Sequence, residues 1–393
     1  MIRPTVATVR LDALQHNARA VRRMLGEAPN SPGIVAVVKA NAYGHGAVEA
    51  GLSLEAAGVD WLACADIAEG VTLRRAGVGV PILVFGALSV GDLDGIFDHT
   101  LTPTVSTPAA ARALEVAAAE RNVTLECHLK IDTGMNRLGF RHDNLGRTMP
   151  AVLASPHLRF TAVYSHCATA DEPESPFLDI QRAAFDRACA QLGAMGLRGV
   201  RRHFANSAAM LRDSRTWYDW VRPGLALYGI VPPPLHAADL VLRPALSLVS
   251  RIVAVKGVRP GEGVGYGLRW PADAKASAGK PGDKVPDGGT VSQPHTIAIV
   301  PAGYADGLDT RLANRAAALV RGRRVPIVGS VCMDMLTVDV TGLDVSPGDE
   351  VVLIGQQGRD EITAREMAAA IGAIPWEVIC RLGSRIERQY EAT

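Results

Sequence analysis

The stretch Ile34-Val35-Ala36-Val37-Val38-Lys39-Ala40-Asn41-Ala42-Tyr43-Gly44-His45-Gly46 is the starting point for the fold and the chemistry of this chain. Its first five residues are apolar and mostly β-branched, which predicts a strand buried on both faces. Glycines punctuate the turn that follows, so Lys39 is expected at the carboxyl end of that strand. Burial of an ammonium lowers its pKa, and an unprotonated lysine is a nucleophile for carbonyl groups. For Lys39 alone, a lysine that ends the strand and reaches water is an equally good explanation.

Short apolar runs and helical stretches continue to alternate as far as about residue 222, which indicates βα units around a parallel sheet. Eight such runs favour a closed (β/α)₈ barrel, and no glycine-rich dinucleotide fingerprint follows the first strand. The expected strands are Val35–Val38, Trp61–Cys64, Ile82–Phe85, Leu101–Val105, Leu125–Ile131, Phe160–Ser165, Arg201–Ala205 and Asp219–Arg222. The expected helices are Gly46–Ala57, Ile67–Ala76, Pro108–Arg121, Phe177–Met195 and Ser207–Arg212.

The pattern changes near Pro232-Pro233-Pro234, because three prolines continue neither a helix nor a central strand. We therefore expect two domains, a barrel over residues 1–240 and a mostly β C-terminal domain over residues 241–393. The second domain is expected to contain strands at Leu246–Val255, Thr296–Val300, Val331–Val340 and Val351–Ile354, and a helix at Thr363–Ile371. The stretch Ala272–Gln293 is rich in Gly, Pro, Lys and Asp and predicts an exposed loop.

The overall composition is that of an ordinary globular protein. The chain has 393 residues with 41 basic and 40 acidic side chains, and this balance gives no reason to expect nucleic acid or a membrane surface as a partner. No apolar run approaches the roughly 18 residues of a membrane span, and the N-terminus lacks the apolar core of a signal peptide. None of the six cysteines forms a C-x-x-C pair, so we expect a cytoplasmic protein without disulfides or a structural metal.

Residues that carry chemistry follow several of the expected strands. In a (β/α)₈ barrel the active site lies at the carboxyl ends of the strands, so these side chains are expected at one mouth. Each of them alone is explained as a helix cap or a rim charge, but together they indicate an anion-binding site around an electrophile. They are Lys39, Lys130, Arg137, His166, Asn206, Ser207 and Arg222.

The stretch from Ala36 to Gly46 resembles the cofactor-lysine signature of the pyridoxal-phosphate-dependent alanine racemases. The resemblance continues through both expected domains in the family's order, and it implies the barrel, the β domain and the cofactor. The further matching segments are Leu11–Leu14 with Asn17, Lys130–Phe140 (KIDTGMNRLGF), His166 with Ala168–Asp171, Asn206–Ala208, Arg222–Gly224 with Leu227–Gly229, Gly265–Gly267, Gly303–Gly307 and Val331–Asp334.

The resemblance implies a two-base racemisation of alanine, supplying D-alanine for peptidoglycan. Lys39 would hold pyridoxal phosphate as a Schiff base and serve one face of the substrate, and Tyr266 of a partner subunit would serve the other. The family therefore implies a homodimer with composite sites. His166 and Arg222 would support Tyr266, and Arg222 would face the pyridine nitrogen, to which it cannot give up a proton.

The resemblance also assigns binding residues. Tyr43, Ser207, Gly224 and the Leu225 N–H match phosphate-binding positions, and Asn206 matches a residue beside the cofactor ring. Arg137 and the Met333 N–H match the groups that hold the substrate carboxylate, and Lys130 matches a lysine that some members carry as a carbamate. Two positions depart from the family pattern. Trp376 stands where a tyrosine is common, and Ser330 stands where an arginine is common.

Four alternatives remain open at this point. A racemase of the same fold could take serine or lysine, and pocket volume would decide between them. A pyridoxal-phosphate decarboxylase would need an acidic partner for the cofactor nitrogen in place of Arg222. A non-catalytic pyridoxal-phosphate carrier predicts a barrel without the β domain, and a cofactor-free Schiff-base aldolase fits Lys39 alone.

Overall fold

The computed structural model describes residues 3–86, 91, 93–236, 240–270 and 294–392. The expected loop at Ala272–Gln293 lies outside the described residues. The contacts within the chain define two compact units. The first, here called the barrel unit, comprises Asp12–Ala42 and Ala47–Arg243; the second, here called the β unit, comprises Met1–Leu11, Tyr43–Gly46 and Pro244–Thr393.

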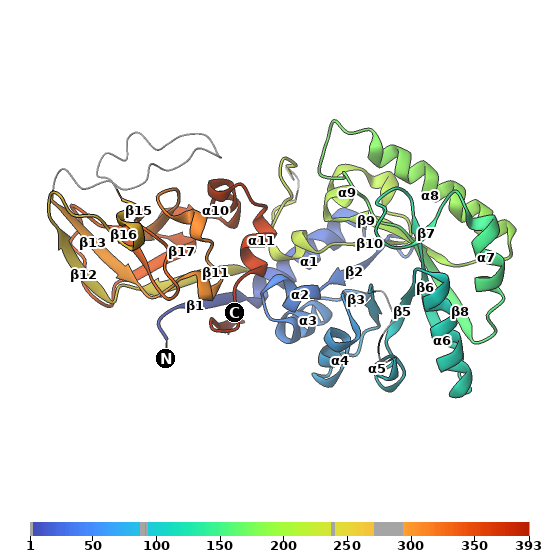
Figure 1. The fold of residues 1–393 in the computed structure, drawn as a ribbon. Helices are drawn as coiled ribbons and strands as arrows, with labels where there is room; N and C mark the ends of the chain where they lie inside the picture. The colour runs from blue at the N-terminus through green and yellow to red at the C-terminus, as the bar shows by residue number, and fades with distance from the viewer. Residues whose placement is uncertain (1–2, 87–90, 92, 237–239, 271–293, 393) are drawn as a thin grey trace. The chain divides into compact units, whose positions relative to one another are not determined.

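The barrel unit is built on a closed ring of parallel strands, which confirms the predicted fold (Figure 1). Among the described residues the ring has eight members, and pairing of β5 with β6 closes it. In ring order the strands are β2 (Gly33–Val37), β3 (Trp61–Cys64), β4 (Ile82–Val84), β5 (Thr102–Val105), β6 (Leu125–Asp132), β8 (Leu158–Tyr164), β9 (Arg201–Asn206) and β10 (Trp220–Arg222). The short β7 (Phe140–Arg141) pairs with the end of β6.

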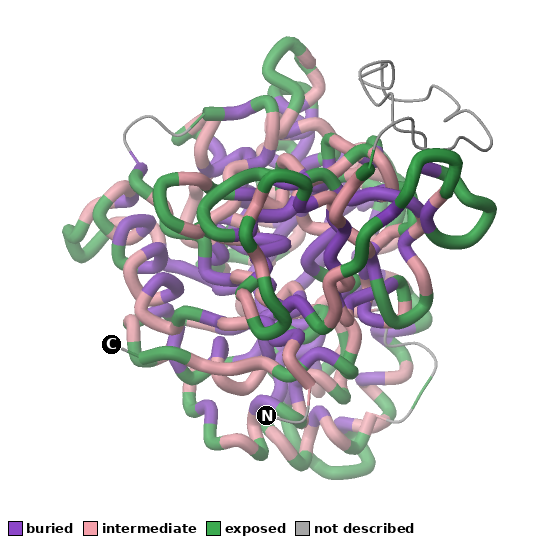
Figure 2. The backbone as a smooth tube through the Cα atoms, turned by 90° about the vertical axis from the view of Figure 1, so that its left-hand side faces the viewer, coloured by how far each residue is buried: buried purple, intermediate pink, exposed green. Residues whose placement is uncertain are grey.

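Helices cover the outside of the ring, and several of them begin at residues whose side chains cap the first turn. Asp66 caps α4 by accepting from the Glu69 N–H, and Thr107 caps α6, where Pro108 occupies the first position. The helices are α1 (Leu11–Leu25), α3 (Ala47–Ala56), α4 (Ile67–Arg75), α5 (Asp94–Asp98), α6 (Pro108–Glu120), α7 (Leu145–Leu153), α8 (Phe177–Ala194) and α9 (Ser207–Arg212). Figure 2 shows buried segments in purple inside the molecule and exposed loops in green at its surface.

The β unit contains one mostly antiparallel sheet. Its strand order is β12-β13-β16-β15-β14-β17-β11-β1-β19, and β18 pairs with β17. The strands are β1 (Val6–Arg10), β11 (Leu246–Arg251), β12 (Ala254–Val258), β13 (His295–Val300), β14 (Ala317–Val320), β15 (Arg323–Val328), β16 (Leu336–Asp339), β17 (Glu350–Gln357), β18 (Asp360–Ile362) and β19 (Glu387–Glu391). The first strand of the chain thus belongs to this sheet, where β1 pairs with β11 and β19.

Two expectations for the second domain need correction. The expected strand Val331–Val340 forms only over Leu336–Asp339, because the Cys332 N–H bonds to the Met335 carbonyl and turns the preceding residues away from the ladder. The expected strand Leu246–Val255 is divided into β11 and β12. The expected helix is confirmed as α10 (Ala364–Ile371), with Thr363 accepting from the Glu366 N–H, and α11 (Pro375–Cys380) follows it.

Among the described residues, none of the helices combines the length and the apolar character that a membrane span requires.

Candidate active site

Lys39 begins a strained turn at the end of β2. Ala40, Asn41, Ala42 and Tyr43 follow it with φ angles of 54°, 53°, 54° and 53°, so four consecutive non-glycine residues are left-handed. Such a conformation costs roughly 1–2 kcal/mol per residue and is typical of functional sites. The turn is held by its own polar contacts, because Ala40 N–H donates to Glu69 and the Asn41 side chain accepts from the Ala47 N–H.

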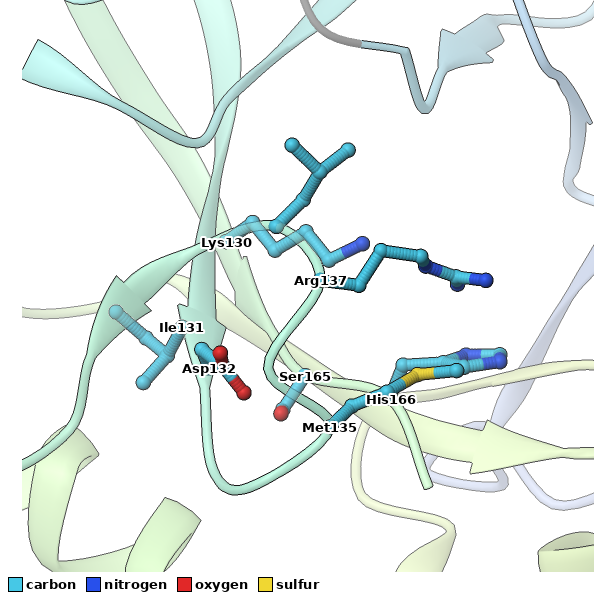
Figure 3. Close-up of a pocket in the computed structure, with 8 residues that line it drawn as sticks. Lys130, Ile131, Asp132, Met135, Arg137, Ser165 and His166 are labelled. Atoms are coloured by element: carbon cyan, nitrogen blue, oxygen red, sulfur yellow. The ribbon is translucent and has the colours of Figure 1, made fainter. Parts of the chain in front are cut away.

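The loop after β6 carries Arg137 and is organised by Asp132. The Asp132 carboxylate accepts from the N–H groups of Gly134 at 3.0 Å and of Asn136 at 3.1 Å. Gly139 closes the loop with φ of 123°, where a Cβ atom would lie 2.7 Å from the Asp132 nitrogen. In Figure 3 the side chains of Lys130, Arg137 and His166 extend side by side along one pocket.

Lys130 is a buried amine in a positively charged environment. Burial lowers the pKa of Lys130 to about 8, and the charges of Arg222, Arg137 and Lys39 contribute to this shift against the opposing effect of Asp132. Its ammonium nitrogen lies 5.4 Å from the ring centroid of Tyr164. A large fraction of Lys130 is therefore neutral at slightly alkaline pH, which makes it a nucleophile.

Arg222, at the end of β10, is buried to 3 % exposure. Its guanidinium donates to the carbonyls of Ser165 at 2.6 Å and Phe204 at 2.9 Å, to Nδ1 of His203 at 2.8 Å, and to Nδ1 of His166 at 3.5 Å. Within the described residues, none of these hydrogen-bond partners is a carboxylate. Burial lowers the pKa of Arg222 to about 10, so the group remains cationic at neutral pH without an anion beside it.

His166 follows β8 and stays neutral in this environment. Burial, together with the charges of Arg222 and Lys130, holds the pKa of His166 well below its ordinary value. Gln181 of α8 fixes its backbone, since the Gln181 amide donates to the His166 carbonyl at 3.0 Å and accepts from the Ala168 N–H at 2.8 Å.

Asn206 and Ser207 join the ends of β9 and β10. The Asn206 side chain caps α9 by accepting from the Ala209 N–H. The Ser207 hydroxyl accepts from the N–H groups of Gly224 at 3.0 Å and Ala226 at 3.2 Å. A hydroxyl has two acceptor sites and one donor, so with both acceptor sites filled the Ser207 proton is directed to a further acceptor. A phosphate dianion fits this donor, and the Gly224 N–H serves it through Ser207.

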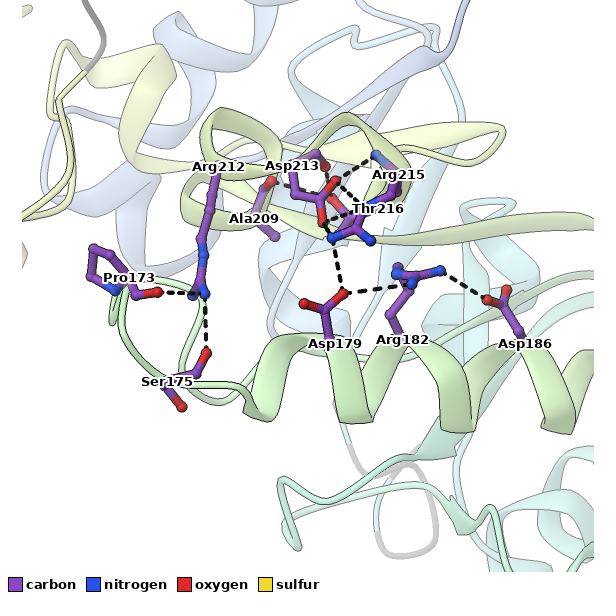
Figure 4. A network of polar contacts seen from close by, with 10 residues as sticks. All are labelled: Pro173, Ser175, Asp179, Arg182, Asp186, Ala209, Arg212, Asp213, Arg215 and Thr216. Atoms are coloured by element: carbon purple, nitrogen blue, oxygen red, sulfur yellow. Dashed lines mark hydrogen bonds and ion pairs between the residues drawn. The ribbon is translucent and has the colours of Figure 1, made fainter.

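A second arginine secures the loop that carries His166. Arg212, the last residue of α9, donates to the carbonyls of Thr169, Glu172, Pro173 and Ser175. Figure 4 shows this arginine beside a separate network in which Arg215 bonds Asp213 and Asp179, and Arg182 bonds Asp179 and Asp186. The loop after β8 is therefore anchored to the helix that begins at Ser207.

Tyr43 and Trp376 both lie in the β unit. The segment Tyr43–Gly46 packs closely on α11, the helix that contains Trp376. The approach is so close that a Cβ on Gly44 would clash with the Ile379 carbonyl. Burial, with a contribution from Cys380, raises the pKa of Tyr43 above its ordinary value, so its hydroxyl remains a donor.

Tyr266 and Met333 are exposed on neighbouring segments of the β unit. Tyr266 is 79 % exposed and Met333 51 % exposed, although both are large apolar side chains. Their segments contact one another, since the Ser330 hydroxyl donates to the Tyr266 carbonyl. We call this surface the β-unit patch, and its exposed members are Tyr266, Leu268, Tyr304, Met333 and Met335.

Known protein families account for both units. Residues 9–232 match the model of the alanine racemase N-terminal domain, and residues 281–390 match that of the alanine racemase C-terminal domain. The chain belongs to the alanine racemase family. Members of this family are pyridoxal-phosphate-dependent isomerases, and the chain is an enzyme of this class.

Individual relatives match over their whole length. The alanine racemase of Symbiobacterium thermophilum is 39 % identical over 99 % of this chain and 97 % of its own. That of Carboxydothermus hydrogenoformans is 39 % identical over 99 % of this chain and 100 % of its own. Among solved structures, alanine racemase from a D-cycloserine-producing Streptomyces lavendulae has a TM-score of 0.90 at 33 % identity, covering 100 % of this chain and 98 % of that chain. The Bacillus anthracis alanine racemase with bound L-Ala-P has a TM-score of 0.86 at 33 % identity, covering 99 % and 95 %.

Three residues of the site did not stand out in the sequence. His203, which bonds Arg222, lies within the expected strand Arg201–Ala205, and Gln181 lies within the expected helix Phe177–Met195. His128 precedes Lys130 by two residues, and alternation along a strand places both on one face. The inward-facing periodicity of β6 was therefore a usable signal for His128, whereas Gln181 had no local signal.

Proposed function

We propose that this chain interconverts L-alanine and D-alanine with pyridoxal phosphate held at the carboxyl ends of the barrel strands, and that it supplies D-alanine for peptidoglycan. The observation that carries the proposal is Arg222, a buried guanidinium held by carbonyls and imidazoles with no carboxylate among its hydrogen-bond partners in the described part of the chain. A pyridoxal-phosphate decarboxylase would place an acidic side chain where Arg222 stands. The matching families over both units support the same conclusion.

The residues assigned to the cofactor fit its chemistry. Lys39 would carry the covalent attachment, and the Ser207 hydroxyl, the Leu225 N–H and Tyr43 would bind the phosphate. Gly224 would orient Ser207, and Asn206 would lie beside the ring. Trp376 has an indole N–H that can donate where the family commonly has a tyrosine. Bound pyridoxal phosphate supplies an electron sink that acidifies the α-proton of the amino acid.

Two side chains would move the proton. Lys39 accepts or returns the α-proton on one face of the substrate, and Tyr266 does so on the opposite face. Racemisation requires this arrangement, because a single base tends to return the proton to the face it came from. His166 would bond the phenol oxygen of Tyr266. Because Arg222 donates to Nδ1 of His166, the neutral ring carries its proton at Nε2 and would donate a hydrogen bond to that oxygen.

Arg222 would donate to the pyridine nitrogen. An arginine gives up no proton at physiological pH, so the nitrogen would stay unprotonated and the electron sink would be weak. Arg222 would in this way limit how strongly the bound cofactor acidifies the substrate. This favours proton return over side reactions such as transamination.

Arg137 and the Met333 N–H would hold the substrate carboxylate. Lys130 would carry a carbamate, which turns a repulsive neighbour of Arg137 into an anion that orients it. The lowered pKa of Lys130, about 8, supports this modification because only the neutral amine reacts with carbon dioxide.

The exposure of Tyr266 supports a homodimer in which the C-terminal domain completes the site of its partner. A catalytic tyrosine would not be 79 % exposed in its working state, and the β-unit patch around it is typical of a protein interface. The proposed location is the cytoplasm, on the argument that no cysteine pair forms a redox motif.

Mixed dimers test the two bases and the composite site together. Lys39→Ala and Tyr266→Phe subunits are each expected to racemise L-alanine poorly. When the two are co-expressed with different tags, each mixed dimer regains one intact site, so about a quarter of wild-type activity returns in an equal mixture. Lys256→Ala, which changes an exposed lysine of β12, is the matched control and is expected to retain full activity.

The possible results separate the alternatives. No recovery in the mixed dimers would overturn the composite site. A Tyr266→Phe protein with wild-type rates in both directions would overturn the two-base assignment. Rates for L-serine or L-lysine above that for L-alanine would instead identify the broader racemase.

A further inference from the structure

Two histidines form a buried line that ends on Arg222. His203 Nδ1 accepts from the Arg222 guanidinium at 2.8 Å, and His203 Nε2 lies 3.2 Å from Nδ1 of His128. Both histidines are completely buried inside the barrel unit. The line runs from Arg222 on β10 through His203 on β9 to His128 on β6.

The donors and acceptors along this line permit one arrangement of protons. A guanidinium only donates, so His203 must present a lone pair at Nδ1 and carry its proton at Nε2. That Nε2–H then donates to His128, which must present a lone pair at its own Nδ1 and carry its proton at Nε2. The tautomer of His203 is thus set from both sides, by the donor Arg222 at Nδ1 and by the acceptor His128 at Nε2.

The surroundings of His128 keep it neutral. Its ring centroid lies 5.0 Å from that of Trp61 and 5.8 Å from that of Trp220, which stacks on it. Burial and the charge of Arg222 lower the pKa of His128 to about 3, and they hold the pKa of His203 well below its ordinary value. The Nε2 atom of His128 has no hydrogen-bond partner within the described residues. A buried N–H without a partner is destabilising, so its presence at His128 Nε2 needs an explanation. A role for the opposite ring nitrogen, Nδ1, as the acceptor for His203 provides one.

We propose that His128 is a positioning residue for the reaction, which keeps His203 in the tautomer that offers a lone pair to Arg222. The two imidazoles replace the carboxylate that commonly supports a buried arginine, and they do so without adding negative charge. This inference rests on the proposed function only in taking Arg222 as the group that faces the cofactor.

Loss of the His128 acceptor has a specific consequence. His203 would then have no partner for its Nε2–H and would gain by moving its proton to Nδ1. In that tautomer an N–H of His203 would face an N–H of Arg222 at 2.8 Å, which is repulsive. Arg222 would turn away and lose its position relative to the cofactor, while the carboxylate-binding groups Arg137 and Met333 would be unaffected.

The tautomers are measured directly by nuclear magnetic resonance on protein labelled with ¹⁵N-histidine. Long-range proton–nitrogen correlations distinguish the protonated from the bare nitrogen of each ring, and a His203→Asn variant assigns the His203 signals. In the wild-type protein His203 and His128 are both expected to carry the proton at Nε2. A proton at Nδ1 of His203, or a doubly protonated ring, would overturn the inference without any activity measurement.

Three variants then separate hydrogen bonding from packing. His128→Phe is expected to shift the His203 proton to Nδ1 and to lower kcat on the order of tenfold, with little change in KM for alanine. His128→Asn places an amide oxygen near the Nδ1 position and is expected to restore both the tautomer and the rate. Trp61→Phe alters packing on the same ring and is expected to leave the tautomer unchanged.

The remaining outcomes are equally decisive. If His128→Phe keeps the His203 tautomer, or if Trp61→Phe changes it as much, His128 has only a packing role and the proposal fails. If His128→Asn behaves like His128→Phe, the acceptor role is wrong. Correct tautomers in a wild-type protein that fails to racemise alanine would contradict the proposed function and leave the histidine arrangement standing.

Discussion

Gln181 provides the sharpest test of how the barrel unit supports its site. This side chain of α8 is fully buried, and its amide is used on both sides. Its oxygen accepts from the Ala168 N–H at 2.8 Å, and its nitrogen donates to the His166 carbonyl at 3.0 Å and to the Thr133 hydroxyl at 3.2 Å. One residue thereby ties the loop after β8 to the end of β6.

The substitution Gln181→Met keeps the length of the side chain and removes all three hydrogen bonds. The Ala168 N–H loses its acceptor in a part-buried contact, and an unpaired donor there costs about 1–2 kcal/mol. The His166 carbonyl also loses a partner, which adds roughly 1 kcal/mol. Thr133 keeps its contact with the Ser165 hydroxyl at 2.8 Å, so its loss is small. The expected fall in the free energy of unfolding is therefore about 2–3 kcal/mol.

Urea denaturation of the two glutamine variants of α8 measures this loss. Gln191 is exposed on the same helix, and Gln191→Met is expected to change stability by less than about 0.5 kcal/mol. Because His166 is displaced, kcat for alanine should also fall in Gln181→Met but not in Gln191→Met. Equal urea midpoints for the two variants would refute the reasoning.

Gln181→Glu adds a dependence on pH with a defined sign. The carboxylate would face the His166 carbonyl, so the variant needs a protonated carboxyl to donate there, and burial raises the pKa of that carboxyl. A group with a raised pKa destabilises the fold progressively as the pH rises from its ordinary pKa, about 4.3, to its raised pKa in the folded protein. Above the raised pKa the loss of stability no longer grows. Gln181→Glu should therefore approach wild-type stability as the pH falls, and a deficit that grows at low pH would contradict this.

Three further predictions follow from single positions. Ala40→Gly should stabilise the protein by about 0.5–1 kcal/mol in denaturant titrations. The relief of left-handed strain, about 1–2 kcal/mol, exceeds the cost of the added entropy of the unfolded chain. A destabilised variant would show that the turn is unstrained. Mass spectrometry of native protein in bicarbonate should find a carbamate on Lys130. This carbamate should be lost as the pH falls below about 8, because the protonated amine does not react. An unmodified Lys130 at a pH of about 8.5, about half a unit above that pKa, would exclude the modification. Gly303→Ala should destabilise the fold by about 1–3 kcal/mol and slow turnover, because its Cβ would clash with the carbonyls of Cys332 and Met333. An unchanged melting temperature and unchanged turnover would show that this segment can shift to accommodate the added methyl group.

The barrel was predictable because its strands are buried on both faces. Such strands appear as continuous apolar runs, and β3 was placed with its observed bounds, Trp61–Cys64. Even β9, which begins with two arginines, was placed within one residue at its end. Local periodicity was sufficient in these cases because each βα unit contacts mainly its neighbours.

The N-terminal strand was not predictable in the same way. β1 (Val6–Arg10) pairs with β11 and with β19, both of which lie in the second half of the chain. A pairing at that separation leaves no mark in the five residues themselves. The alternation at Val331–Met335 misled for the opposite reason, since its exposed methionines belong to the β-unit patch and not to a strand.

The candidate site was predictable where a residue ends a strand and not where it supports one. Lys130 lies near the end of β6 and His166 follows β8, so both were found by position. The charges of Lys39, Arg137 and Arg222 all act on Lys130, which places the four residues in one neighbourhood. Gln181 lies within α8, 15 residues after His166, and carries no motif. Its role follows only from tertiary contacts.

The balance of charge explains why this site needs such supports. The ring centroid of Tyr164 lies 5.4 Å from the Lys130 ammonium and 5.1 Å from the Arg222 guanidinium, and the neutral ring of His203 stacks on it at 4.6 Å. An aromatic ring and neutral imidazoles stabilise nearby cations without cancelling their charge. A carboxylate in their place would neutralise the attraction that an anionic cofactor and an amino-acid carboxylate require. The fold thus holds buried cations with uncharged acceptors, and replacing any of these acceptors by an acid should weaken ligand binding more than it weakens the fold.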